Sequence, residues 1–294
     1  MDLSNVKYIV IPDVHGRSFW KEPVKQAIDA EVHIIFLGDY VDPYGHENIS
    51  RETAIDILGE IIELKKSHRN MVHLLIGNHD LHYIDDSKYG CRMDIDNRER
   101  IMKMFLDDFD CFRFMYSSRV NGKNFLFSHA GFLVDWLTDS IDELGYAITD
   151  YENEVDYLKK FNEFKNSIDF DFINKFDWKE MWNEKPYWKS KIAEASYSRG
   201  GNAAYGSMIW SDVSEHLICS DKVNDCIQIF GHSQQYIDPV RYGDDIYCLD
   251  CRKVFAITND GNVVDENLNE LKDNGTEISN NYKDQLKKHM SFFV

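Results

Sequence analysis

Three short apolar runs in the first quarter of the chain are each followed by polar residues that can bind metal. The runs cover residues 8–11, 34–37 and 72–76, and their length and composition predict buried strands. Asp13, Asp39 and Asn78 follow them in turn. Open α/β sheets keep their functional sites outside the carboxyl ends of the strands. We therefore expect residues of these three loops to meet at one edge of a sheet.

Five short motifs between residues 13 and 233 supply further side chains of the same kind. In chain order they are Asp13-Val14-His15-Gly16, Gly38-Asp39-Tyr40-Val41-Asp42, Gly77-Asn78-His79-Asp80, Ser128-His129-Ala130-Gly131 and Gly231-His232-Ser233. Carboxylates, imidazoles and one amide, without a thiolate, suit Mn, Fe or Zn better than a closed structural zinc site. One such motif alone is commonly an ordinary turn. Five in this order predict a pair of divalent metals held side by side.

In these motifs the sequence resembles the calcineurin-like metallophosphoesterases, and more narrowly their phosphoprotein phosphatase branch, which is serine/threonine phosphatase-like. The family pattern is Asp-x-His-Gly, Gly-Asp-x-x-Asp, Gly-Asn-His-Asp/Glu, His-x-Gly and Gly-His, and the likeness runs from about Val6 to about Thr258. The resemblance implies an α/β fold, with two mixed β-sheets packed face to face and flanked by helices. It also implies a metallophosphoesterase domain over residues 1–258, before a polar C-terminal tail at 259–294.

The resemblance implies a role for each polar residue of the motifs. Asp39 is the carboxylate expected to bridge two metals, and the other expected ligands are Asp13 and His15 on one metal and Asn78, His129 and His232 on the other. His79 is expected to protonate the departing alkoxide, with Asp42 keeping its imidazole charged and oriented. The alternative for His79 and Asp42 is a hydrogen bond that only steadies the metal-binding loops.

Two positions depart from the pattern of the phosphoprotein phosphatases. That branch usually has Arg directly after Gly-Asp-x-x-Asp and before Gly-Asn-His, where this chain has Pro43 and Ile76. Substrate phosphate is therefore expected to be bound by other groups, and the candidates are Arg199, Arg17 and the amide of Asn78. For both arginines an ordinary surface role is the alternative.

The expected activity is hydrolysis of phosphomonoesters by a hydroxide that bridges two divalent metals, as the resemblance implies. Mn²⁺ is the expected metal, with Fe or Zn as alternatives, and phosphorylated Ser, Thr or Tyr in proteins is the leading substrate class. One alternative is a hydrolase of dinucleoside polyphosphates or similar nucleotides. An alternative from another class is a metal-binding interaction scaffold with weak catalysis. The oligomeric state is left open.

Charge and cysteine content narrow the expected partners and compartment. The chain has 33 Lys and Arg against 51 Asp and Glu, and the net charge of -18 disfavours a nucleic-acid substrate, because it repels phosphate backbones. Bound metals would make the electrostatic potential positive at the site itself, so a small phosphate ester could still bind there. The first residues lack the plan of a signal peptide and no apolar run is long enough for a bilayer, so we expect a cytoplasmic protein without membrane contact. Cys248 and Cys251 are expected to be buried, reduced thiols.

The remaining pattern predicts the layout of the elements. Helices are expected over about 18–30, from an N-cap at Ser50, and over about 97–108. Strand pairs at 112–117 with 123–127, and at 226–230 with 246–251 and 254–258, suggest a second, more antiparallel sheet. Residues 139–197 interrupt the family pattern with many aromatic side chains, which indicates either a helical cap beside the site or an insertion anchored to the body. Residues 259–288 are polar enough to be loose.

Overall fold

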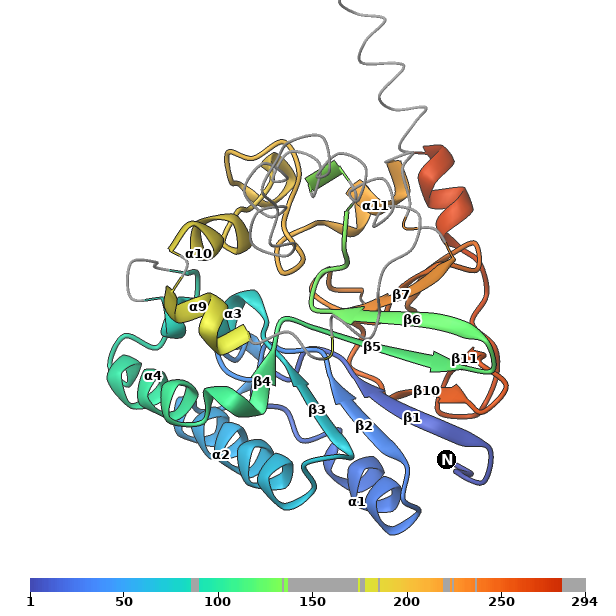
Figure 1. The fold of residues 1–294 in the computed structure, drawn as a ribbon, viewed down its shortest axis with the longest axis horizontal. Coiled ribbons are helices and arrows are strands. Elements are labelled where there is room, and N and C mark those ends of the chain that lie inside the picture. Colours follow the sequence, from blue (N-terminus) through green and yellow to red (C-terminus); the bar gives the residue numbers. More distant parts are fainter. Residues whose placement is uncertain are drawn as a thin grey trace, which may run out of the picture.

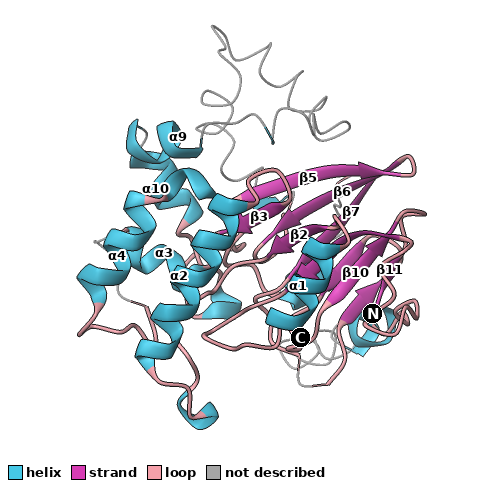
Figure 2. Ribbon diagram, turned by 90° about the horizontal axis from the view of Figure 1, so that it is seen from below, coloured by secondary structure: helices cyan, strands magenta, loops and turns pink. Residues whose placement is uncertain are grey.

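The computed structural model describes residues 1–85, 90–133, 135–136, 174, 178–184, 186–218, 223, 225–235 and 237–281. Most of the predicted insertion and the last residues of the chain lie outside these ranges. Within them, the molecule is built from two β-sheets that face each other, with helices outside the first sheet (Figures 1 and 2). No helix of the described ranges has the length and apolar character that crossing a bilayer requires.

The first sheet is mixed and contains the three strands that precede the metal-binding motifs. Its strand order is β11-β10-β1-β2-β3-β4, and β1 to β4 run parallel while β10 is antiparallel to both β1 and β11. The bounds are β1 Val6–Ile11, β2 His33–Phe36, β3 Val72–Leu75, β4 Phe112–Arg113, β10 Phe255–Thr258 and β11 Val263–Val264.

Helices flank this sheet. They are α1 Lys21–Asp29, α2 Arg51–Ser67, α3 Asn78–Ile84 and α4 Arg98–Asp107, and short 3-10 turns lie at Gly45–Glu47 and Phe109–Cys111. Ser50 caps α2 as predicted, since its side chain accepts a hydrogen bond from the Thr53 amide. Figure 1 shows α1 and α2 below β1, β2 and β3, with β5 and β6 on the opposite side.

Alternation along β1 explains why the sheet is covered on both faces. Ile9 and Ile11 belong to the core cluster that includes the apolar stripe of α2. Tyr8 and Val10 belong to another cluster, which includes Phe125 of the second sheet. Adjacent residues of one strand therefore fill two separate cores, and this accounts for the unbroken apolar run in the sequence.

The second sheet has the strand order β5-β6-β7-β9-β8. Its bounds are β5 Met115–Val120, β6 Lys123–Ser128, β7 Cys226–Phe230, β8 Val240–Tyr242 and β9 Ile246–Cys248. β5 and β8 are antiparallel to their neighbours, whereas β6, β7 and β9 run parallel to one another. The two mixed sheets and their flanking helices confirm the predicted fold class.

Two strand assignments made from the sequence are wrong in detail. The predicted strand 112–117 is divided, because β4 ends at Arg113 in the first sheet and β5 begins at Met115 in the second. The predicted strand 254–258 joins the first sheet beside β1 and not the second. In both cases the apolar pattern is locally that of a strand, and only pairing over long sequence distances selects the sheet.

The described end of the insertion is packed against the body. It comprises α9 Trp178–Glu184 and α10 Pro186–Ile192, followed by a 3-10 turn at Tyr197–Arg199 and by α11 Val213–Ile218. The Trp182 ring lies 5.6 Å from the Phe114 ring, and both side chains are buried in the main core. Aromatic side chains thus anchor this part of the insertion. Residues 139–173, 175–177 and 185 of the insertion lie outside the described ranges.

The sequence suggested a loose segment after Thr258, but parts of this segment pack against the body. Val263–Val264 forms β11 beside β10, and Leu271 is buried. Further on, the Ser279 hydroxyl donates to the carbonyl oxygen of Leu217. A few apolar residues and one hydrogen bond therefore attach this mainly polar segment to the body of the protein, as far as residue 281.

Candidate metal centre

The loops that carry the predicted site residues have an unusual backbone conformation. His15, Asp39, Asp42 and His232 have φ angles of 46°, 55°, 59° and 63°. Positive φ is uncommon for residues other than glycine and collects where function requires a particular side-chain direction. All four side chains are almost completely buried. The strand ends therefore turn sharply and direct polar groups inward.

Two glycines of the motifs are required by the closeness of the loops. A Cβ atom on Gly77 would lie 2.2 Å from Asp39 Oδ1, and a Cβ atom on Gly231 would lie 2.2 Å from Asp13 Oδ1. No other residue type fits at such a distance. The glycine before Asn78 and the glycine before His232 thus let these residues approach the carboxylates of other strands.

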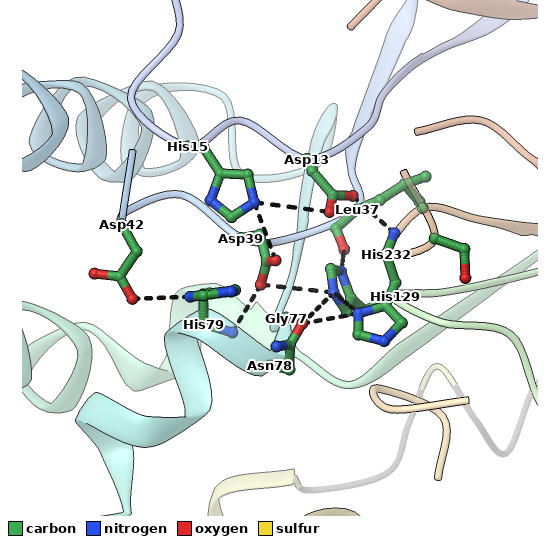
Figure 3. A network of polar contacts seen from close by, with 12 residues as sticks. Asp13, His15, Leu37, Asp39, Asp42, Gly77, Asn78, His79, His129 and His232 are labelled. Atoms are coloured by element: carbon green, nitrogen blue, oxygen red, sulfur yellow. Dashed lines mark hydrogen bonds and ion pairs between the residues drawn. The ribbon is translucent and has the colours of Figure 1, made fainter. Parts of the chain in front are cut away.

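Asp39 lies between two groups of side chains (Figure 3). Its Oδ2 atom is 3.4 Å from Nε2 of His15, and its Oδ1 atom is 3.5 Å from Nε2 of His129. Asp13 lies near both groups, since its Oδ2 is 4.0 Å from His15 Nε2 and one ligand atom each of Asp13, Asp39 and His129 lie within 4.8 Å of one another. One carboxylate therefore presents one oxygen to each group, which is the arrangement expected of a bridging ligand.

The second group brings three predicted ligands together. The Asn78 Oδ1 atom lies 3.0 Å from Nε2 of His129 and 2.8 Å from Nδ1 of His232. The two imidazole nitrogens are 3.2 Å apart. Residues separated by more than 150 positions in the chain thus direct their polar atoms at one point.

Hydrogen bonds to backbone carbonyls fix which ring nitrogen of two histidines faces the site. Nδ1 of His15 donates to the carbonyl of Val41, and Nδ1 of His129 donates to the carbonyl of Leu37, each at 2.8 Å. Nε2 is then the nitrogen that each ring directs toward Asp39. Metal-binding histidines are commonly oriented in this way.

The charge state of the cluster also fits cations. Burial lowers the pKa of His15 to about 3 and lowers that of His232 well below its ordinary value, so both imidazoles are neutral. Burial raises the pKa of Asp13, and the nearby Asp39 carboxylate raises it further. A buried carboxylate destabilised in this way gains most from a bound cation. The possible ligands present, which are carboxylates, imidazoles and one amide, thus fit one or two divalent metals.

His79 lies next to the first group, since one ligand atom each of His15, Asp39 and His79 lie within 4.8 Å of one another. Its backbone N–H donates to Asp39 Oδ1 at 2.8 Å, and its Nδ1 is 2.9 Å from Oδ2 of Asp42. Burial opposes a charge on His79, but Asp39 and the hydrogen bond to Asp42 outweigh it and raise the pKa of His79 to about 10. The Asp39 contribution becomes smaller once cations neutralise that carboxylate. His79 is therefore built to carry a proton at the edge of the site.

Asp42 is fixed by residues that the sequence reading left without a role. The Tyr83 hydroxyl donates to Asp42 Oδ1 at 2.5 Å, and its oxygen in turn accepts from the Asp94 amide. His82 Nε2 lies 2.7 Å from Asp42 Oδ2, at ion-pair distance but without the alignment of a hydrogen bond. The spacing of His79 and His82 within one turn of α3 was the available signal.

The two arginines predicted to bind phosphate are near the site but already engaged. Arg17 donates from Nε to both carboxylate oxygens of Glu47, at 3.1 and 3.0 Å. Arg199 lies at ion-pair distance from Asp212, 2.8 Å, and donates to the Ser233 hydroxyl at 2.6 Å. Each guanidinium is thus paired with a carboxylate, although Glu47 also pairs with Arg252 at 3.0 Å and the Nη2 atom of Arg17 has no hydrogen-bond partner within the described residues.

Three further residues at the site were not predicted. Asp250 is buried, and burial together with the adjacent Asp13 raises its pKa well above the ordinary value. Arg92 reaches Nε2 of His79, and Cys91 Sγ lies 3.8 Å from the same atom. Cys91 and Arg92 come from the segment between α3 and α4, where no motif marked them. Cys248 and Cys251 are buried free thiols, as expected.

Comparison with known proteins identifies the family. The family model described as calcineurin-like phosphoesterase matches residues 6–264. Since this match covers most of the chain, the protein belongs to the calcineurin-like phosphoesterases, as the motifs predicted, and it is a metal-dependent phosphatase that hydrolyses phosphoric esters. The residues that carry the family pattern are those that the fold brings together around Asp39.

Solved structures with a similar arrangement include two phosphatases. A cold-active protein-tyrosine phosphatase of the psychrophile Shewanella sp. has 14% sequence identity and a TM-score of 0.49, with 92% of this chain and 81% of that chain covered. A protein serine/threonine phosphatase from Saccharomyces cerevisiae has 14% identity and a TM-score of 0.46, with 86% and 73% covered. Comparison with curated proteins gave no match.

Proposed function

We propose that the protein hydrolyses phosphomonoesters with two divalent metals, and that its natural substrates are proteins phosphorylated on Ser, Thr or Tyr. The observation that carries the proposal is the position of Asp39, which presents one oxygen to His15 and the other to His129. A single metal would need only one of these groups. We assign Asp13, His15 and Asp39 to one metal, and Asp39, Asn78, His129 and His232 to the other, with Mn²⁺ as the expected ion.

Two bound cations would supply a nucleophile formed from water at neutral pH and would neutralise charge on the phosphoryl group. The chain's own residues then have to orient the ester and handle the leaving oxygen. His79 is placed for the second task, because Asp42 fixes its Nδ1 and thereby directs Nε2 away from Asp42. A proton on Nε2 can pass to the departing alkoxide, which is too basic to leave alone.

The surroundings of Asp42 support this division of labour. Asp42 accepts a hydrogen bond from Tyr83, and it contacts both His79 and His82. These contacts hold the carboxylate in place and keep it ionised, because the contacts with His79 and His82 outweigh burial and lower the pKa of Asp42. An ionised, immobile carboxylate is what keeps an imidazole charged and correctly turned.

The test is turnover by the metal-loaded full chain on matched substrates. We expect hydrolysis of a phosphoseryl or phosphotyrosyl peptide and of 4-nitrophenyl phosphate. Both activities should be lost in chelator and restored by Mn²⁺. Preferred cleavage of a dinucleoside polyphosphate would reject the phosphoprotein assignment. Full activity in chelator without added metal would reject the metal-dependent reaction.

A further inference from the structure

We propose that Arg92 binds the phosphoryl oxygens of the substrate, an inference that rests on the proposed function. The Arg92 guanidinium lies beside the side-chain nitrogen that is assigned to protonate the leaving oxygen. Its Nη2 lies 2.9 Å from Nε2 of His79, the atom assigned to the leaving oxygen. In a phosphate ester the leaving oxygen and the other three oxygens share one phosphorus atom. A group within hydrogen-bond distance of Nε2 is therefore also within reach of the neighbouring oxygens.

Arg92 differs from the other arginines of the site in its charge balance. Arg17 is paired with Glu47, and Arg199 is paired with Asp212. The contacts of the Arg92 guanidinium are instead the His79 ring, the carbonyl oxygen of Asp42 at 2.8 Å, and the face of the Tyr44 ring. Within the described ranges no carboxylate pairs with it. Arg92 thus keeps a positive charge that an anionic substrate can use.

The side chain is also oriented in advance. The guanidinium carbon lies 3.6 Å from the centre of the Tyr44 ring, which is close stacking for such a pair. The contact with the Asp42 carbonyl places it at the Asp42-Pro43 turn. This is where the family pattern would have an arginine and this chain has Pro43. An arginine from another segment thus contacts the backbone next to Pro43.

The backbone around Arg92 is fixed on both sides. Arg92 has a φ angle of 63°, a left-handed conformation that a residue with a side chain rarely adopts. Its carbonyl oxygen accepts from Arg51 on α2 at 3.3 Å, and the following Met93 is buried. The Asp94 amide then donates to Tyr83 at 2.7 Å. The side chain itself remains partly exposed, as a residue that meets a substrate must be.

The contact with His79 has a consequence for substrate binding. The Arg92 Nη2 atom, at 2.9 Å from Nε2, occupies the space that a leaving oxygen would need. Arg92 therefore has to move from Nε2 to the phosphoryl oxygens when the ester binds, and this exchange requires only a short movement over the Tyr44 ring.

The experiment compares Arg92→Ala and Arg92→Lys with wild type in the metal-loaded full chain. We measure KM and kcat for 4-nitrophenyl phosphate and for a phosphoseryl peptide, together with inhibition by inorganic phosphate. Loss of charge-assisted hydrogen bonds should raise both KM and the inhibition constant of phosphate by roughly 10- to 100-fold in Arg92→Ala. Arg92→Lys should recover part of the loss, because it keeps the charge. The matched control is Arg100→Ala, an exposed arginine of α4 paired with Glu52.

Unchanged KM and unchanged phosphate inhibition in Arg92→Ala would overturn the proposal, even if kcat fell. Loss of bound metal in both variants would also overturn it, because a substrate contact is not needed to hold the ions. Binding of inorganic phosphate to the metal-loaded protein, followed by calorimetry, separates this proposal from the proposed function. If wild type binds phosphate through Arg92 but cleaves no ester, the proposed function fails and the Arg92 site stands.

Discussion

Replacement of His79 by Asn separates proton donation from metal binding. The backbone N–H of His79 holds Asp39 Oδ1, and this contact survives any change of side chain. No expected ligand atom is removed, so metal content should stay at the wild-type level. A nitrophenolate departs readily without a proton, whereas a serine or threonine alkoxide does not. General acids contribute about 10²- to 10⁴-fold, so His79→Asn should slow alkyl phosphate hydrolysis by roughly that factor and aryl phosphates much less.

The assay is kcat on a phosphoseryl peptide and on 4-nitrophenyl phosphate, with metal content measured on the same samples. Asp42→Asn should give the same pattern more weakly, because Tyr83 and His82 still surround that position while the charge is lost. The sign of the pH dependence follows from the raised pKa of His79. Alkyl ester turnover should fall as pH rises through that pKa, and the fall should disappear in His79→Asn. Equal losses on both esters, or metal loss, would show that His79 only supports the metal loops.

Three further outcomes follow from the geometry. Asp39→Asn should lower metal content and abolish hydrolysis, whereas Asp56→Asn on the exposed side of α2 should change neither; an Asp39→Asn protein with two bound metals would contradict the bridging role. Ser50→Ala should lower the free energy of unfolding by about 1 kcal/mol without affecting metal content, with Ser18→Ala as the control, and equal stability of both variants would contradict the cap. Replacing 139–173 by a short linker should change the ranking of substrates but keep aryl phosphate cleavage; loss of folding would instead show that the insertion serves to stabilise the body.

The elements that carry the motifs could be predicted from the sequence because their signals are local. A buried run followed by a ligand and a glycine predicts a strand that ends at the site, and β1, β2 and β3 all follow this rule. The glycines of the motifs are informative as well, since a Cβ atom at Gly77 or Gly231 would lie 2.2 Å from a carboxylate oxygen of another loop. The N-cap at Ser50 likewise depends only on its neighbours in the chain.

What the sequence could not predict depends on distant pairing. Phe114 separates β4 from β5, but nothing nearby shows that the chain changes sheets there. β10 pairs with β1 from the other end of the chain, and that pairing follows from the whole fold. Arg92 was missed because it reaches His79 from an irregular segment. Asp250 was missed because its Cys-x-x-Cys setting indicated only buried thiols.

A crystal structure of the protein grown with Mn²⁺, with anomalous scattering recorded at the manganese edge, tests the two-metal account most directly. The account predicts two peaks about 3.5–4 Å apart on either side of Asp39, one beside His15 and one beside His129. His79 should make no bond to either ion. One peak only, or a peak held by Asp42, His79 and His82, whose ligand atoms also lie within 4.8 Å of one another, would contradict the account.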